Sequence, residues 1–282
     1  MASMMTNASA LTALQSLNAT NKNLEVTQSR ISTGYRVAEA SAYWPIATTM
    51  RPDNNALSTV QDALGLGASK VDTAYTGMTK AIDTVNQIKV KLVAATGASD
   101  ADKAKIQTEI KALQDQAKAY ADASSFSGTN MLSVNSGATA TTASDVKIVS
   151  AFNRSAAGVA SISTIDVNVE NVKLYEAGTA AGVNKGILDS NRTSAGVEGT
   201  ASAPTLGAAA VGTDTYTVAT MQLTNGTLFA SDTQIGAMLG VVESALKDMT
   251  TAATTLGAAK SRIDLQKTFT QSLMDSIERG VG

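Results

Sequence analysis

Reactive side chains are scarce in this sequence of 282 residues, which contains no cysteine and no histidine. These absences exclude disulfides, thiol catalysis, a serine–histidine–aspartate triad and a zinc site with the usual ligands. A carboxylate pair or a nucleophilic lysine could still do chemistry in principle. We nevertheless predict that the protein is not an enzyme and that it holds no metal and no cofactor.

The remaining candidates for chemistry are four basic residues in the middle of the sequence: Arg154, Lys173, Lys185 and Arg192. They lie in a segment rich in Ser, Thr and Asn, where cations and hydroxyls together could contact an acidic sugar. Scattered surface charge is the simpler explanation of these four residues. A cell-surface protein that binds a polysaccharide or acts as an adhesin is therefore an alternative function, to be weighed against a structural role for the helices described next.

The charge balance and the hydropathy exclude two classes of partner. The 24 acidic and 22 basic residues nearly cancel, so the protein has no field that would hold nucleic acid or an anionic membrane. No run of 18 apolar residues occurs, so we expect no membrane insertion. The first 24 residues lack the basic cluster and apolar core of a signal peptide, so we expect no cleavable leader.

Apolar residues spaced seven apart are the strongest pattern in the sequence. One row begins at Leu57 and continues through Leu64, Val71, Met78, Val85 and Leu92. A second row alternates with it, and Gly67 is its one gap: Val60, Ala74, Ala81 and Ile88. A strict period of seven predicts helices that pack as a left-handed coiled coil, here a rod helix over residues 53–96. A similar pattern near the end predicts its partner: Ile235, Leu239, Val242, Leu246, Met249 and Leu256.

A shorter amphipathic helix is predicted over residues 9–31. Its apolar stripe consists of Leu11, Leu14, Leu17, Leu24 and Ile31. Asn21 and Gln28 interrupt the interior of this helix, so it should be marginal alone and become ordered in an assembly. Docking on its own domain is the other interpretation.

Prolines, glycines and short alternating runs predict the segments between the helices. Residues 33–52 contain Pro45 and Pro52 and are predicted to be a connector, with Pro52 starting the rod helix. Gly97 ends that helix, and Ser99 caps a third helix that turns back antiparallel. Short alternating runs at 146–152, 162–172 and 216–223 predict strands.

We therefore predict a mainly α protein, in which a long antiparallel coiled-coil helical rod carries a small β-rich insertion domain. The domains are an N-terminal helix over 1–32, the first part of the rod with its connector over 33–130, the variable β-rich segment over 131–232 and the second part of the rod over 233–282. The sharp change in composition at both borders of the insertion suggests that the rod folds without it.

Several stretches together resemble bacterial flagellin of the alphaproteobacterial type. The similar stretches are 7–18, 27–37, Ala-Tyr-Trp-Pro-Ile-Ala-Thr-Thr-Met-Arg at 42–51, Asp-Ala-Leu-Gly-Leu-Gly at 62–67, Phe-Ser-Gly-Thr-Asn-Met-Leu at 126–132, and 256–264. Each motif is weak alone, whereas their order and spacing are specific. The resemblance covers about 1–135 and 233–282, and residues between them match nothing that we can name.

The resemblance implies a structural subunit of the flagellar filament, exported through the flagellar type III channel and located at the cell surface. The leucine stripe of residues 1–32 then corresponds to the inner polymerisation core. Its implied partners are further copies of the chain, the filament cap, the hook–filament junction proteins and an export chaperone. A surface glycan is a further possible partner.

The sequence departs from the flagellin pattern in two respects. A short Asp-Asn-Ala-type insert is missing before Ala42, and Pro45 and Pro52 stand where serine is expected. The family also continues beyond Gly282 with a helix that partners the first one, so we expect this chain to lack the C-terminal polymerisation helix and to need it for native filaments.

Overall fold

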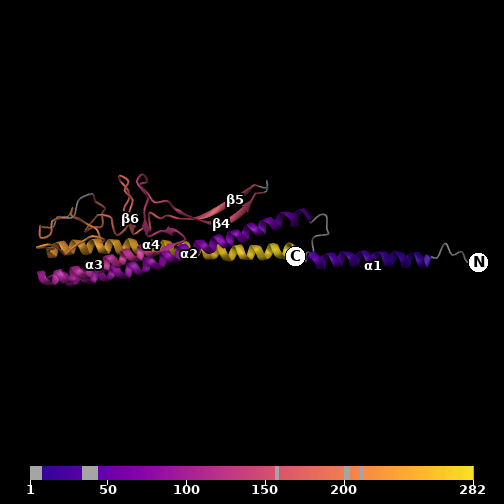
Figure 1. The fold of residues 1–282 in the computed structure, drawn as a ribbon, viewed down its shortest axis with the longest axis horizontal. Coiled ribbons are helices and arrows are strands. Elements are labelled where there is room, and N and C mark those ends of the chain that lie inside the picture. Colours follow the sequence, from indigo (N-terminus) through magenta and orange to yellow (C-terminus); the bar gives the residue numbers. More distant parts are fainter. Residues whose placement is uncertain (1–7, 34–43, 156–158, 200–203, 210–212, 282) are drawn as a thin grey trace, which may run out of the picture. The chain divides into compact units, whose positions relative to one another are not determined.

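Four helices dominate the computed structural model, which describes residues 8–33, 44–155, 159–199, 204–209 and 213–281. They are α1 (Ala8–Thr33), α2 (Trp44–Ala95), α3 (Asp100–Ala123) and α4 (Asp232–Val281) (Figure 1). The predicted mainly helical fold with a small β-rich region is thereby confirmed.

The β-rich region consists of short paired strands. They are β1 (Ser125–Phe126), β2 (Thr129–Asn130), β3 (Ser133–Val134), β4 (Val146–Arg154), β5 (Ala160–Val167), β6 (Tyr175–Glu176), β7 (Arg192–Thr193), β8 (Thr215–Tyr216), β9 (Thr224–Asn225) and β10 (Leu228–Phe229). Pairing is antiparallel for β1–β2, β7–β8 and β9–β10 and parallel for β3–β6, while β4 pairs with β5.

The chain divides into two compact units, and the division does not follow the sequence order of the predicted domains. One unit contains residues 1–62, 151–161 and 267–282. The other contains 63–150 and 162–266, which include most of the β-rich insertion together with long stretches of three helices. The predicted borders at 131 and 232 therefore do not separate the insertion from the helices it lies on.

Helix α2 begins earlier than the sequence predicts. It starts at Trp44, within the expected connector, and continues through Pro52 without interruption. Pro45 lies in the first turn, where a missing backbone N–H costs little. Pro52 lies in the helix interior, but its ring is exposed, so the helix can accommodate it on the solvent side. The other connector residues, 34–43, lie outside the described part of the chain.

The two rows of α2 spaced by seven face the core. All six residues of the first row are buried: Leu57, Leu64, Val71, Met78, Val85 and Leu92. At the gap in the second row, a Cβ on residue 67 would overlap the side chain of Ile148, which is itself buried in β4. The glycine therefore leaves a notch in the helix, and a residue from the insertion occupies it.

Helix α4 buries a slightly different set from the predicted one. Ile235, Val242, Met249 and Leu256, spaced by seven, are fully buried. Leu239 and Leu246 were also predicted for the core, but they are only half-buried, and the buried residues are Met238, Val241 and Ala245. The residues three and four positions after Ile235 both lie beside the buried row, so contacts with neighbouring elements decide which of the two is buried.

The turn between α2 and α3 forms as predicted. Gly97 has a φ of 72°, a left-handed conformation that ends α2 without steric cost. Ser99 is the N-cap of α3, and its hydroxyl accepts a hydrogen bond from the backbone N–H of Asp102. Gly97 N–H also donates to Asp232 Oδ1 at the start of α4, so the ends of three helices meet here.

The motif at 126–132 ends α3 and starts the insertion. Ser127 and Gly128 both have positive φ, which gives the tight turn between β1 and β2. Asn130 then donates from its side chain to the carbonyls of Ala121 and Asp122, at 2.8 and 3.1 Å. These bonds satisfy helix-end carbonyls that would otherwise lack a partner.

Of the three predicted longer strands, the third is shorter than expected. Residues 146–152 and most of 162–172 are in β4 and β5, but the run at 216–223 contributes only Tyr216 of β8. Thr217 and Thr220 instead form a local turn, in which Thr220 N–H donates to Thr217 Oγ1. Threonine hydroxyls compete in this way with strand pairing.

Candidate assembly surface

Helix α1 carries apolar side chains that are largely exposed. Leu14, Leu17 and Leu24 are each more than half exposed, although they form one stripe. The side chains of Leu11 and Ile31, which complete the predicted stripe, lie outside the described side chains. A single helix cannot bury its own apolar stripe, and most helical stability comes from packing of that face, so these leucines need a partner to be buried.

The second half of α4 carries exposed apolar side chains in addition to its buried core row. Leu265 is 70% exposed and Phe269 60% exposed, and Leu273 is more than a third exposed. Steps of four residues keep them on one side of the helix, because each residue turns it by about 100°. Ile263, which continues the core row, is buried, and so is Thr270, three residues before Leu273. The sequence analysis missed this stripe, although its spacing of four was visible.

Helix α4, which carries the second stripe, is joined to α2 by two ion pairs. Lys260 Nζ lies 2.6 Å from Asp72 Oδ1, and Lys89 Nζ lies 2.9 Å from Glu243 Oε1. The neighbouring carboxylate raises the pKa of Lys260 through a hydrogen bond and through its charge. These pairs are exposed, so each adds little stability, but together they fix which residues of α2 lie beside α4.

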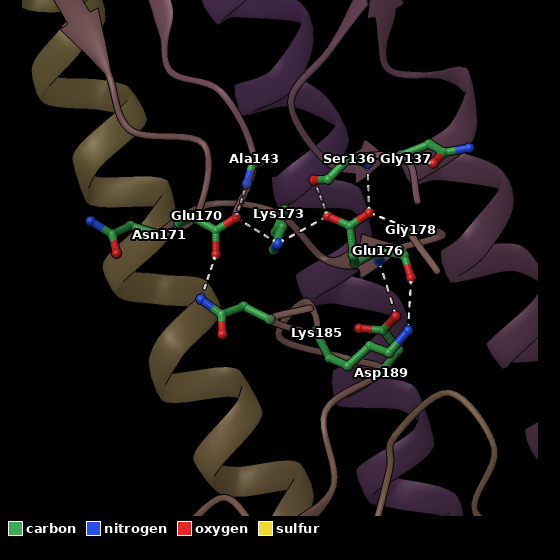
Figure 2. A network of polar contacts seen from close by, with 12 residues as sticks. Ser136, Gly137, Ala143, Glu170, Asn171, Lys173, Glu176, Gly178, Lys185 and Asp189 are labelled. Atoms are coloured by element: carbon green, nitrogen blue, oxygen red, sulfur yellow. Dashed lines mark hydrogen bonds and ion pairs between the residues drawn. The ribbon is translucent and has the colours of Figure 1, made fainter. Parts of the chain in front are cut away.

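The four cations proposed as contacts for an acidic sugar are already paired with acids or carbonyls. Lys173 is 0% exposed and lies 2.7 Å from Glu170 Oε1 and 3.0 Å from Glu176 Oε2 (Figure 2). Lys185 donates to the carbonyl oxygen of Glu176 at 3.3 Å.

The two arginines are held in the same way. Arg154 forms a forked pair with Asp53, whose hydrogen bonds raise the pKa of the guanidinium. Arg192 is buried and pairs with Asp248 of α4. The prediction that these four residues bind an acidic sugar is therefore not supported, because sugar binding would have to displace their carboxylates.

The polar network in Figure 2 holds the insertion together. Burial raises the pKa of Glu176, but hydrogen bonds from Ser136, Lys173 and Gly178 outweigh burial and lower it to about 2. Burial alone would also raise the pKa of Glu170. Hydrogen bonds from the N–H of Ala143 and the amine of Lys173 outweigh burial, so the pKa of Glu170 is lowered. Both acids stay ionised and structural rather than catalytic.

Within the described residues, no group of three or more His, Cys, Asp or Glu side chains lies close enough to hold a metal ion. No helix in the described part of the chain is long and apolar enough to cross a membrane.

Comparison with known proteins identifies the family. Residues 4–137 match the bacterial flagellin N-terminal helical region. Flagellin C of Rhizobium meliloti (strain 1021) is 45% identical over 294 aligned residues, which cover 100% of this chain and 86% of that protein. The chain belongs to the bacterial flagellin family. As a flagellin, it is a structural subunit of the extracellular flagellar filament.

Other flagellins are also similar to this chain over its whole length. The flagellin of Brucella melitensis biotype 1 is 44% identical over 285 residues, covering 100% of this chain and 84% of the relative. Flagellin A of Rhizobium meliloti is 38% identical over 356 residues, again covering the whole chain. That alignment is longer than this chain, so the relative contains residues without a counterpart here. The predicted alphaproteobacterial resemblance is confirmed.

Proposed function

We propose that this flagellin polymerises through two exposed apolar stripes on helices that a coiled-coil rod supports. The first stripe is that of α1, with Leu11, Leu14, Leu17, Leu24 and Ile31, and the second is that of α4, with Leu265, Phe269 and Leu273. The observation that carries the proposal is that α4 exposes Leu265, Phe269 and Leu273 in addition to burying its own core row. A filament subunit needs a second apolar side because its neighbours must cover it.

The supporting rod is an antiparallel coiled coil of α2 and α4. Both helices bury residues spaced by seven, as a coiled coil requires. The two ion pairs join Asp72 to Lys260 and Lys89 to Glu243. Asp72 and Lys89 are separated along α2 by the same number of residues as Lys260 and Glu243 along α4, but the order of the partners is reversed. Equal and opposite steps are the geometry of antiparallel helices in constant register.

The partners of this surface are further copies of the chain. At the two ends of a filament, the filament cap and the hook–filament junction proteins would meet the same kind of apolar surface, and an export chaperone would cover it before assembly. The role is structural rather than catalytic, with the β-rich segment 131–232 on the outside of the filament. Neither a cofactor nor a metal takes part.

A paired substitution tests the α4 stripe. Leu265→Ser together with Phe269→Ser should leave the melting temperature of the soluble protein nearly unchanged, because both side chains are exposed. In a form of the chain that carries the C-terminal polymerisation helix of the family, the same two substitutions should greatly slow the elongation of filament seeds, as followed by light scattering and electron microscopy.

Val90→Ser is the matched control, since Val90 is 65% exposed on α2 and outside the stripe. It should behave as wild type in both measurements. Normal elongation by the Leu265→Ser, Phe269→Ser protein would overturn the assignment of this stripe to assembly. A large fall in its melting temperature would show instead that the stripe is covered within the single chain.

A further inference from the structure

A pocket of about 490 Å³ lies within the β-rich insertion, between the turn after β8, the β9–β10 hairpin and α4. Its buried walls include Tyr216, Met221 and Met238. Its rim carries the exposed side chains of Gln222 and Asn225. The volume lies within the range of about 300–1,000 Å³ that is usual for small-molecule sites.

Tyr216, one of the residues that line this pocket, has a buried hydroxyl without a partner among the described residues. The residue Tyr216 is only 2% exposed, and its hydroxyl makes no hydrogen bond within the described structure. Buried hydroxyls are nearly always paired, so an unpaired one calls for a ligand or an ordered water molecule. Burial raises the pKa of this phenol to about 12, helped by the charge of Asp214, so the hydroxyl remains a donor at neutral pH.

The remaining lining residues define the chemistry of a ligand. None of them is charged: besides Tyr216, Met221, Met238, Gln222 and Asn225, they are Asn191, Pro204, Thr205, Leu206, Thr217, Thr220 and Leu228. Amides and hydroxyls at the rim offer both donors and acceptors, whereas the methionines offer an apolar floor. A ligand ring with hydroxyls on its edge and C–H groups on its face matches this arrangement. Its hydroxyls would bond to the rim, and its C–H groups would lie on the apolar floor. An anionic ligand would meet no cation, with Asp214 close to Tyr216.

We propose that this pocket binds a neutral pyranose sugar, with the Tyr216 hydroxyl donating to one ring hydroxyl and the Gln222 and Asn225 amides bonding others. This binding is separate from filament assembly, because none of the pocket residues belongs to the α1 or α4 stripes. It also differs from the acidic-sugar hypothesis, since it uses none of the four paired cations.

The test uses the full chain and the methyl glycosides of glucose, galactose and mannose, followed by two-dimensional NMR titration. At least one glycoside should give saturable shifts of residues around Tyr216. Tyr216→Phe should weaken that binding about fivefold to tenfold, as expected for one neutral hydrogen bond. Gln222→Ala should also weaken it, without changing the melting temperature, since Gln222 is exposed. Tyr75→Phe, on the exposed surface of α2, should bind as wild type.

Stability gives a second readout that needs no sugar. If the hydroxyl is unpaired in the free protein, Tyr216→Phe should melt at the same temperature as the wild type or higher. A clear loss of stability would show that another group of the protein already pairs this hydroxyl, which would overturn the proposal. It would also be overturned if no methyl glycoside bound, if Tyr216→Phe bound as wild type, or if methyl glucuronide alone bound.

Discussion

Ile148 of β4 packs against Gly67 of α2 at the one position where the second apolar row of that helix has no side chain. A Cβ on residue 67 would overlap Ile148 Cγ2 and lie 3.1 Å from Cγ1. The notch and the side chain that enters it come from segments far apart in the sequence. The insertion is therefore part of the same packed core as the helices of its unit.

Substitution of Gly67 by alanine should destabilise the protein. Glycine to alanine within a helix normally stabilises by roughly 0.5–1 kcal/mol, and that is the expected result for Gly65→Ala, since a Cβ there meets nothing within 4 Å. Gly67→Ala should instead lower the melting temperature, because the new methyl group displaces Ile148. Adding Ile148→Ala to Gly67→Ala should recover part of the loss. Equal stabilisation by both single alanines would exclude the packing described here.

Val71→Asp should unfold or strongly destabilise the helical unit. Val71 is fully buried in the first row of α2, so an unpaired carboxylate there should cost about 3–5 kcal/mol. Val90→Asp, on the exposed side of the same helix, should cost well under 1 kcal/mol by comparison. Thermal melts followed by circular dichroism measure both variants. Similar melting temperatures for the two would contradict the burial of the row.

Acid should weaken the insertion through Glu176. Its folded pKa of about 2 lies below the unfolded value of about 4.3. A group with a depressed folded pKa contributes stability above the unfolded pKa and loses that contribution as the pH falls toward the folded one. We therefore expect a loss on the order of 3 kcal/mol between pH 5 and about 2. Urea unfolding at several pH values should show this slope.

Glu176→Gln should flatten that pH dependence, because the side chain no longer titrates. It should also lower stability at neutral pH, since Lys173 loses one of its two carboxylates. Glu278→Gln, on the exposed surface of α4, is the control and should keep the wild-type slope. An unchanged slope in Glu176→Gln would assign the acid sensitivity to other carboxylates.

Gln114 of α3 ties the insertion to the helices. Its buried amide donates to the carbonyls of Val218 and Met221, at 2.9 and 3.0 Å. Gln114→Met keeps the length of the side chain but leaves both carbonyls without this donor, at a cost of about 1–3 kcal/mol. Gln116→Met, on the exposed side of α3, should change stability little. Equal melting temperatures for the two variants would mean that the insertion is not held through Gln114.

Sequence periodicity alone predicted the long helices, apart from the start of α2, and the side of α2 that is buried. Residues such as Val71 and Met78 were predicted from a spacing of seven, because a helix returns to nearly the same side after seven residues. Gly97 and Ser99 were likewise predictable, since a left-handed glycine and a serine cap act within one turn of chain. The motifs that indicated flagellin are also local runs of sequence.

Contacts between distant segments were decided by the tertiary structure. Periodicity could not choose between Leu239 and Met238, because both flank the same seam and only the neighbouring elements determine which is covered. Nor could it show that Ile148 enters the Gly67 notch or that Lys173 is buried between two carboxylates. Burial and pairing depend on which side chains meet in space, and a residue's type and neighbours in sequence do not specify that for an insertion of short strands.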